Sequence, residues 1–218
     1  YSHAEGRGIT FGDFSHAEGG NSIITAPIAW GLASHAEGWR TFTYLNNTGS
    51  HSEGAFTVAS GSYSHAEGNS TISRGEYSHT EGHLTSTATD ASGSHAEGYN
   101  TSTSAKYAHS EGSASNASGI ASHTEGRATI TLGSYSHAEG AETVTVGENS
   151  HAEGDSTSAS GSNTHAEGES TIAKGIGSHT EGYKTITSGA YSHAEGSSSI
   201  AEGPYSHASG RGTIAFGT

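Results

Sequence analysis

The chain has 218 residues, with 33 Gly, 2 Pro and neither Cys nor Met, and only 30% of its residues are hydrophobic. Its 8 Lys and Arg against 22 Asp and Glu give a formal net charge of −14, which disfavours binding to a nucleic-acid backbone. The absence of Cys excludes disulfides and Cys-based zinc or redox sites. Apolar runs of only a few residues exclude a membrane-spanning helix. Because the sequence has no initiating Met and no signal peptide, we expect a segment of a longer protein.

A motif of the form Ser-His-Ala-Glu-Gly recurs fifteen times along the chain with small variations. From His95 to His207 every interval between successive motif His residues is 14, and the earlier intervals are 13, 19, 16, 14, 14 and 16. The insertions lie near Ala26-Pro27, Leu45-Asn46-Asn47 and Ala88-Thr89-Asp90, and are predicted to be loops. We therefore predict a single repeat domain over residues 1–218, irregular over 1–94 and strict over 95–218.

The repeat unit is numbered here from its His, which is position 1. Gly at positions 4 and 11 divides the unit into two halves, each predicted to be a strand of about five residues followed by a two-residue corner where Gly provides a positive φ. Frequent Gly, dense Ser and Thr, and the lack of a 3.6-residue apolar period make helices implausible. The predicted fold is all-β: a parallel β-roll or β-solenoid with two short strands per turn and about fifteen turns.

Strand alternation indicates which side chains face the interior. Positions 14, 2, 7 and 9 are small in nearly every unit, whereas position 10 admits Arg74, Lys174 and Glu202, which cannot be buried unpaired. We therefore expect positions 14, 2, 7 and 9 to fill a thin interior, and positions 1, 3, 8 and 10 to face outward. Such small side chains bury little apolar area, so the roll is predicted to need partners, namely further copies of itself.

The outward positions 1 and 3 carry fifteen His and fourteen Glu, and Ser209 replaces the missing Glu. A ladder that meets copies of itself has a reason to be uniform, because each His N–H can donate to a neighbour's carboxylate. We hypothesise that it lines the axis of a homotrimer. One alternative is that the repeats are alike only because they arose by duplication. Another is that the apolar position-8 column, from Phe42 to Ile214, forms the contact between subunits. The predicted axial residues are His65, Glu67, His79, Glu81, His95, Glu97, His109, Glu111, His123, Glu125, His137, Glu139, His151, Glu153, His165, Glu167, His179, Glu181, His193 and Glu195.

Tyr recurs at position 13, on the corner before Ser-His. This aromatic stripe either contacts sugars or protein, or covers the edge of the roll or a groove between subunits, and the second reading is favoured. The stripe consists of Tyr63, Tyr77, Tyr107, Tyr135, Tyr191 and Tyr205.

The pattern Ser-x-Ala-x-Gly-x-x-Ser/Thr-x-Ala-x-Gly-x-x resembles the head repeat of trimeric autotransporter adhesins, and its Ser-His-Ala-Glu-Gly form is similar to repeats in phage tail-fibre and tailspike proteins. The resemblance covers essentially residues 1–218 and is strictest over 95–218. It implies a left-handed parallel β-roll, a homotrimer and an extracellular location on a virion tail or bacterial surface. Residues matching His65 and Glu67 are usually apolar and axial in the adhesins, so the polar residues here imply a hydrogen-bonded or hydrated axis.

These observations lead us to expect a non-enzymatic structural or adhesive segment of a trimeric fibre, with itself as partner and a cell-surface glycan or protein as receptor. No catalytic, cofactor or metal residues are predicted, because a motif repeated fifteen times offers no singular constellation and only His83 lies outside it. The alternative is a stand-alone solenoid with a regular surface for metal ions or ice. Stacked His and Glu could bind Zn²⁺ or Ni²⁺, but Thr-x-Thr pairs such as Thr101/Thr103 suit ice only if positions 7 and 9 face outward.

Overall fold

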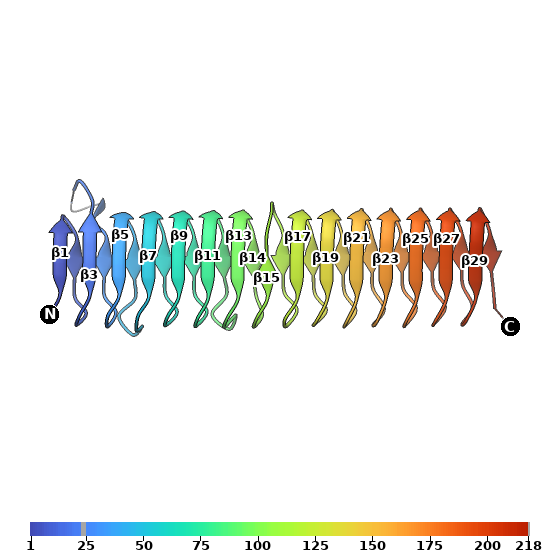
Figure 1. Cartoon of the computed structure of the whole chain (residues 1–218), viewed down its shortest axis with the longest axis horizontal. Coiled ribbons are helices and arrows are strands. Elements are labelled where there is room, and N and C mark those ends of the chain that lie inside the picture. Colours follow the sequence, from blue (N-terminus) through green and yellow to red (C-terminus); the bar gives the residue numbers. More distant parts are fainter. Residues whose placement is uncertain (23–24, 218) are drawn as a thin grey trace. The chain divides into compact units, whose positions relative to one another are not determined.

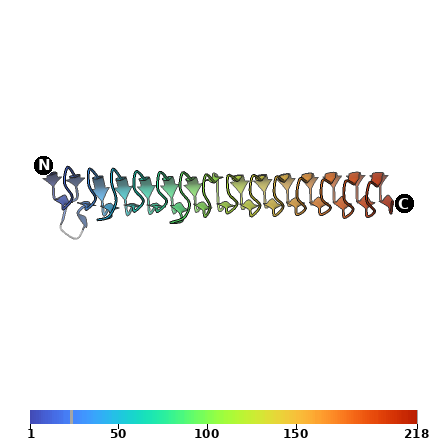
Figure 2. The same ribbon diagram turned by 90° about the horizontal axis from the view of Figure 1, so that it is seen from below.

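Each repeat forms one turn of a parallel β-solenoid of about fifteen turns, as the sequence predicts, and no α-helix occurs in the described part of the chain. The computed structural model describes residues 1–22 and 25–217. The chain divides into two compact units, Tyr1–Ser113 and Ala114–Thr218, which are described separately. Every turn contributes one strand to each of two parallel sheets, and Figures 1 and 2 show this alternation within each unit.

The first sheet contains the Ser-His-Ala-Glu-Gly segments, which form the longer strands. In the first unit its strands are β1 (His3–Gly6), β3 (His16–Gly19), β5 (His35–Trp39), β7 (His51–Ala55), β9 (His65–Asn69), β11 (His79–His83), β13 (His95–Tyr99) and β15 (His109–Ser110). In the second unit they are β17 (His123–Arg127), β19 (His137–Ala141), β21 (His151–Asp155), β23 (His165–Glu169), β25 (His179–Tyr183), β27 (His193–Ser197) and β29 (His207–Arg211).

The second sheet consists of two-residue strands at positions 8 and 9. In the first unit they are β2 (Ile9–Thr10), β4 (Ile28–Ala29), β6 (Phe42–Thr43), β8 (Val58–Ala59), β10 (Ile72–Ser73), β12 (Ser86–Thr87) and β14 (Ser102–Thr103). In the second unit they are β16 (Asn116–Ala117), β18 (Ile130–Thr131), β20 (Val144–Thr145), β22 (Ser158–Ala159), β24 (Ile172–Ala173), β26 (Ile186–Thr187), β28 (Ile200–Ala201) and β30 (Ile214–Ala215). The expected five-residue length of this strand was therefore wrong, because the backbone turns away at positions 11 to 13.

Glycine recurs at positions 4 and 11, where the next turn lies close to the backbone. Gly68, at position 4, has the expected positive φ, 106°, although it lies within β9, and a Cβ on it would lie 2.2 Å from the carbonyl oxygen of Gly82. Gly133, at position 11, has no positive φ, so the expectation of one there was wrong; a Cβ on it would lie 2.0 Å from the carbonyl oxygen of Gly147 in the next turn. The left-handed corner residues are instead at positions 6 and 13, such as Ser70 with φ 60° and Tyr77 with φ 56°.

The interior has the predicted composition of small side chains. Positions 14, 2, 7 and 9 are buried in the turns between the first and the last, and Ala152, Ala159, Ala166 and Ala173 form one apolar cluster. Hydroxyl groups in this core bond to one another and to the backbone. The Thr131 Oγ1 donates to the Ser122 Oγ at 2.9 Å, and the Ser122 Oγ donates to the Gly119 carbonyl oxygen at 2.7 Å.

The three predicted insertions lie in loops or corners between strands, and the strands on either side keep their register. Residues 45–47 lie between β6 and β7, and residues 88–90 lie between β12 and β13. Pro27 is buried at the inward position before β4, so the extra residues of that turn precede it. Within the described residues, no helix is long and apolar enough to cross a membrane.

Candidate functional site

The parallel register of the first sheet places identical residues on top of one another. In the pair β19 and β21, His137 faces His151 and Glu139 faces Glu153. Because positions 1 and 3 point to the same side of a strand, each unit carries a column of His beside a column of Glu. We call these two columns together the His/Glu column.

The imidazole rings of the His/Glu column are stacked face to face. Ring centroids lie 4.6 Å apart between His35 and His51, with planes 2° from parallel, and 4.9 Å apart between His137 and His151, also at 2°. The first pair, His3 and His16, instead meets edge to face, at 69°. The rings are thereby held in one orientation along each unit.

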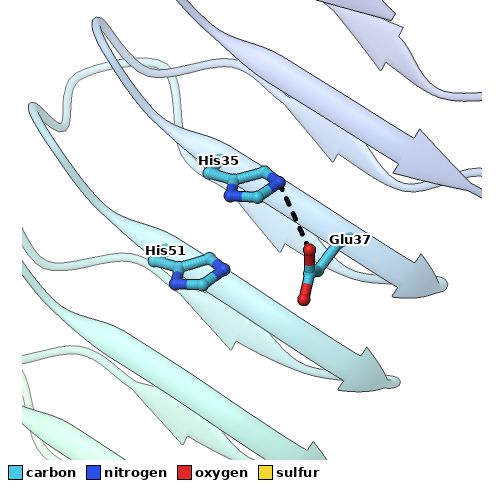
Figure 3. Close-up of side chains that lie close together, drawn as sticks. All are labelled: His35, Glu37 and His51. Atoms are coloured by element: carbon cyan, nitrogen blue, oxygen red, sulfur yellow. Dashed lines mark ion pairs between the residues drawn. The ribbon is translucent and has the colours of Figure 1, made fainter. Parts of the chain in front are cut away.

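Most of these His direct their Nε2 toward a carboxylate at position 3. The His35 Nε2 lies 3.5 Å from the Glu37 Oε2, and Figure 3 shows this contact next to the stacked His51 ring. The Glu53 carboxylate lies between two turns, with its Oε2 3.8 Å from the His51 Nε2 and its Oε1 3.7 Å from the His65 Nε2. The nitrogens and oxygens are close to one another but mostly beyond hydrogen-bond distance.

The Nε2 atoms of the column are shielded from solvent, although the His side chains that carry them are partly exposed. The His51 side chain is 34% exposed. Its Nε2 is nevertheless shielded from solvent and has no hydrogen-bond partner among the described residues. The same holds for the Nε2 of His16, His35, His65, His79, His95, His137, His151, His165, His179 and His193. A repeated, enclosed and unpartnered polar atom indicates a ligand or partner that completes it.

Burial favours the neutral form of several imidazoles in the column. Burial, followed by the repulsion of neighbouring imidazoles, lowers the pKa of His51, His65 and His137 below the ordinary 6.5. The pKa values of His165 and His179 are lowered for the same reasons. In its neutral form each of these five rings offers one donor and one acceptor nitrogen.

The carboxylates of the column share protons from turn to turn. Hydrogen bonds with the Glu on either side raise the pKa of Glu139 and Glu167 to about 7, and they lower that of Glu153 between them. Glu97 is raised to about 7 in the first unit, and its neighbour Glu81 is lowered. Stacked like charges thus do not all ionise at neutral pH.

A shallow acidic groove follows the Glu side of the column. In the second unit it has a volume of about 950 Å³ and is lined by position-3 Glu and position-4 Gly from Glu125 to Gly210. Shorter sections in the first unit are lined by Glu67, Glu81 and Glu97 and, nearer the N-terminus, by Glu5, Glu18 and Glu37. The groove suits cations or hydrogen-bond donors.

The residues predicted for the axis lie where the sequence placed them, at positions 1 and 3 of the first sheet. Strand β15 is shortened to His109–Ser110, so Glu111 lies just beyond its end. The role of these residues in a trimer axis stays a prediction, since the structure describes one chain. His83, the His outside the motif, is exposed and meets the Tyr99 ring at a centroid distance of 5.4 Å.

The predicted tyrosine stripe lies on exposed corners. Tyr63 and Tyr77 stack at 5.2 Å and Tyr191 and Tyr205 at 5.4 Å. All six tyrosines are more than half exposed. Covering of these rings by a ligand or by another subunit stays a prediction.

One apolar site was missed by the sequence reasoning. A pocket of about 570 Å³ in the first unit is lined by Trp30, Phe42, Thr43, Tyr44, Leu45 and Val58. Trp30 also stacks on Phe11 at 4.1 Å. The sequence did contain a signal for this pocket, because Trp, Phe and Leu are concentrated in the irregular turns.

No protein-family model matches the chain, and no curated protein matches it significantly.

Proposed function

We propose that the chain is a non-enzymatic structural and adhesive segment of a homotrimeric fibre that supports attachment to a cell surface. The observation that carries this proposal is the His/Glu column, in which His and Glu repeat in register through both units and many His have an enclosed Nε2 with no hydrogen-bond partner among the described residues. Further copies facing the column would supply hydrogen-bond partners that one chain does not supply to itself.

The composition of the core supports the need for partners. Among the described residues, the largest fully buried side chains are Thr, and the buried hydrophobic core residues are Ala. Each of these contributes little apolar burial against the backbone entropy lost on folding, which is roughly 1–2 kcal/mol per residue. A trimer would add buried area along the length of each unit.

The other function classes are less well supported by the geometry. The Thr-x-Thr pairs face inward, since Thr101 and Thr103 are each 1% exposed, so they form no ice-binding surface. Catalysis requires a singular arrangement of groups in a pocket, whereas the His/Glu column repeats the same arrangement at every turn. In this proposal the fibre is extracellular, on a virion tail or a bacterial surface, and a glycan or protein receptor is its partner.

Sedimentation velocity tests the assembly directly. We expect a species near three times 22.0 kDa. In the variant carrying His137→Ala and Glu139→Ala we expect weaker association and a lower melting temperature. The matched control carries Ile186→Thr and Ile200→Thr in the position-8 column, and its assembly should have the wild-type mass. A 22.0 kDa species at all concentrations would contradict the trimer. Dissociation of the control but not of the His/Glu variant would show that the subunits meet at position 8.

A further inference from the structure

We propose that the His/Glu column binds divalent transition-metal ions, each held by the Nε2 of one His and by carboxylate oxygens from the same and the preceding turn. The ligands belong to one chain, so the inference does not rest on the proposed trimer. It gives the His/Glu column a metal-binding role in addition to the structural role proposed above.

The spacing of ligand atoms fits a metal ion better than it fits a hydrogen bond. The His165 Nε2 lies 3.6 Å from the Glu153 Oε1 and 3.9 Å from the Glu167 Oε2. Two ligands on one tetrahedral ion, with bonds of about 2.1 Å, lie about 3.4 Å apart. Shifts of a few tenths of an ångström would therefore bring the His165 Nε2 and each of these two oxygens to the spacing of two ligands on one ion. Hydrogen bonds would require a larger approach, to about 2.9 Å.

A related grouping, with two His around one Glu, occurs in the first unit. Ligand atoms of His51, Glu53 and His65 lie within 4.8 Å of one another, and those of His65, Glu67 and His79 do so too. The Nε2 atoms of these three His are enclosed and lack a hydrogen-bond partner among the described residues. Unlike a cluster of carboxylates alone, each site combines an oriented imidazole nitrogen with oxygen ligands.

The ligand set selects the class of metal. Imidazole with carboxylate suits Zn²⁺, Co²⁺, Ni²⁺ and Cu²⁺, whereas Mg²⁺ and Ca²⁺ prefer oxygen ligands alone. Doubly charged ions in every successive turn would repel one another along the column, because the stacked rings of His165 and His179 lie only 4.8 Å apart. We therefore expect fewer than one ion per turn, with water in the remaining coordination positions.

The test uses the full chain without a polyhistidine tag, freed of metal with a chelator. Titration with Zn²⁺ by calorimetry should show several sites per chain, and a large excess of Mg²⁺ should not displace the metal. Addition of Co²⁺ should produce the visible absorption of a four-coordinate ion. Absence of heat with Zn²⁺, or displacement by Mg²⁺, would overturn the proposal.

A pair of matched variants separates the column from general negative charge. The column variant carries Glu139→Gln, Glu153→Gln and Glu167→Gln, and the control carries Glu142→Gln, Glu148→Gln and Glu202→Gln, which remove three exposed charges elsewhere in the same unit. We expect the column variant to lose sites or to bind Zn²⁺ at least tenfold more weakly there, and the control to bind like the wild type. Equal losses in both variants would show that the binding is nonspecific. Circular dichroism confirms folding of both variants, and sedimentation of the metal-free protein tests the trimer independently.

Discussion

At the scale of single residues, the interior depends on where each hydroxyl finds a partner. The Ser64 Oγ donates to the Gly61 carbonyl at 2.7 Å, and other position-14 Ser repeat this bond to position 11. Position 7 is less uniform. The Thr185 Oγ1 donates to the Glu181 carbonyl at 2.9 Å, whereas the Thr171 Oγ1, one turn earlier, has no partner among the described residues. Two chemically identical and equally buried Thr are therefore expected to contribute differently to the free energy of unfolding.

Replacing each of these Thr by Val separates packing from hydrogen bonding. Thr185→Val should lower the free energy of unfolding by about 1 kcal/mol, because it removes a buried hydrogen bond and leaves a carbonyl less satisfied. Thr171→Val should leave the free energy unchanged or raise it by up to about 1 kcal/mol, because it removes an unpaired hydroxyl. Urea unfolding measures both, each variant being the control of the other. Equal destabilisation by the two would contradict this account.

At the scale of secondary-structure elements, the strands of the first sheet carry two columns that respond oppositely to pH. The lowered pKa values of His such as His51 and His137 mean that the unfolded chain binds more protons below pH 6.5, so their contribution to stability falls on acidification. The pKa values of about 7 for Glu97, Glu139 and Glu167 mean that the folded chain binds more protons between pH 4.5 and 7. Their contribution is present below pH 4.5 and lost as the pH rises through 7.

Replacing the three Glu whose pKa is raised should reveal how the His residues alone change stability with pH. Gln resembles a protonated Glu at all pH values, so a variant with Glu97→Gln, Glu139→Gln and Glu167→Gln keeps the donors and loses their titration. Between pH 7 and pH 5, the melting temperature of this variant should fall more steeply than that of the wild type. The measurement is thermal melting followed by circular dichroism in buffer with a chelator.

The control for the pH measurement is the variant with Glu142→Gln, Glu148→Gln and Glu202→Gln, outside the column. Its melting temperature should follow the wild-type pH dependence. If the column variant also follows it, the carboxylates do not share protons.

At the scale of the whole molecule, each turn contacts mainly the turn before and the turn after it. In the second unit β21 pairs with β19 and β23, and β22 pairs with β20 and β24. In such repeat proteins stability is approximately a sum over turns and the interfaces between neighbouring turns. The fourteen-residue turn is then the smallest piece that can be removed without disturbing the rest.

Deletions of different length test this modularity. Deletion of residues 151–164 joins Ser150 to His165 in the same phase, so the melting temperature should stay within about 5 °C of the wild-type value. Deletion of residues 158–164 removes β22 and half of a turn, leaving the second sheet interrupted. We expect this shorter deletion to cost more stability than the longer one. The opposite order in thermal melting would refute independent turns.

The sequence predicts the fold well because its signals repeat. Small residues at positions 2, 7, 9 and 14 and the charged Arg74 and Lys174 at position 10 are enough to assign the inside and the outside. The two-residue length of the second strand was not predictable from the Gly spacing, because the corner depends on φ values of residues such as Tyr77 that have no strong preference for them. The proton sharing of Glu139 and the enclosed Nε2 of His51 were not predictable either, since both depend on distances between turns.

The extra residues at the corners show where the chain can vary in length. Residues 88–90 lengthen one turn, yet β11 and β13 still pair residue for residue, from His79 and His95 to His83 and Tyr99. Extra residues at a corner are thus tolerated without a change in the ladder beside them. A protein of this design can change the length and chemistry of its corner loops while the paired strands beside them stay the same.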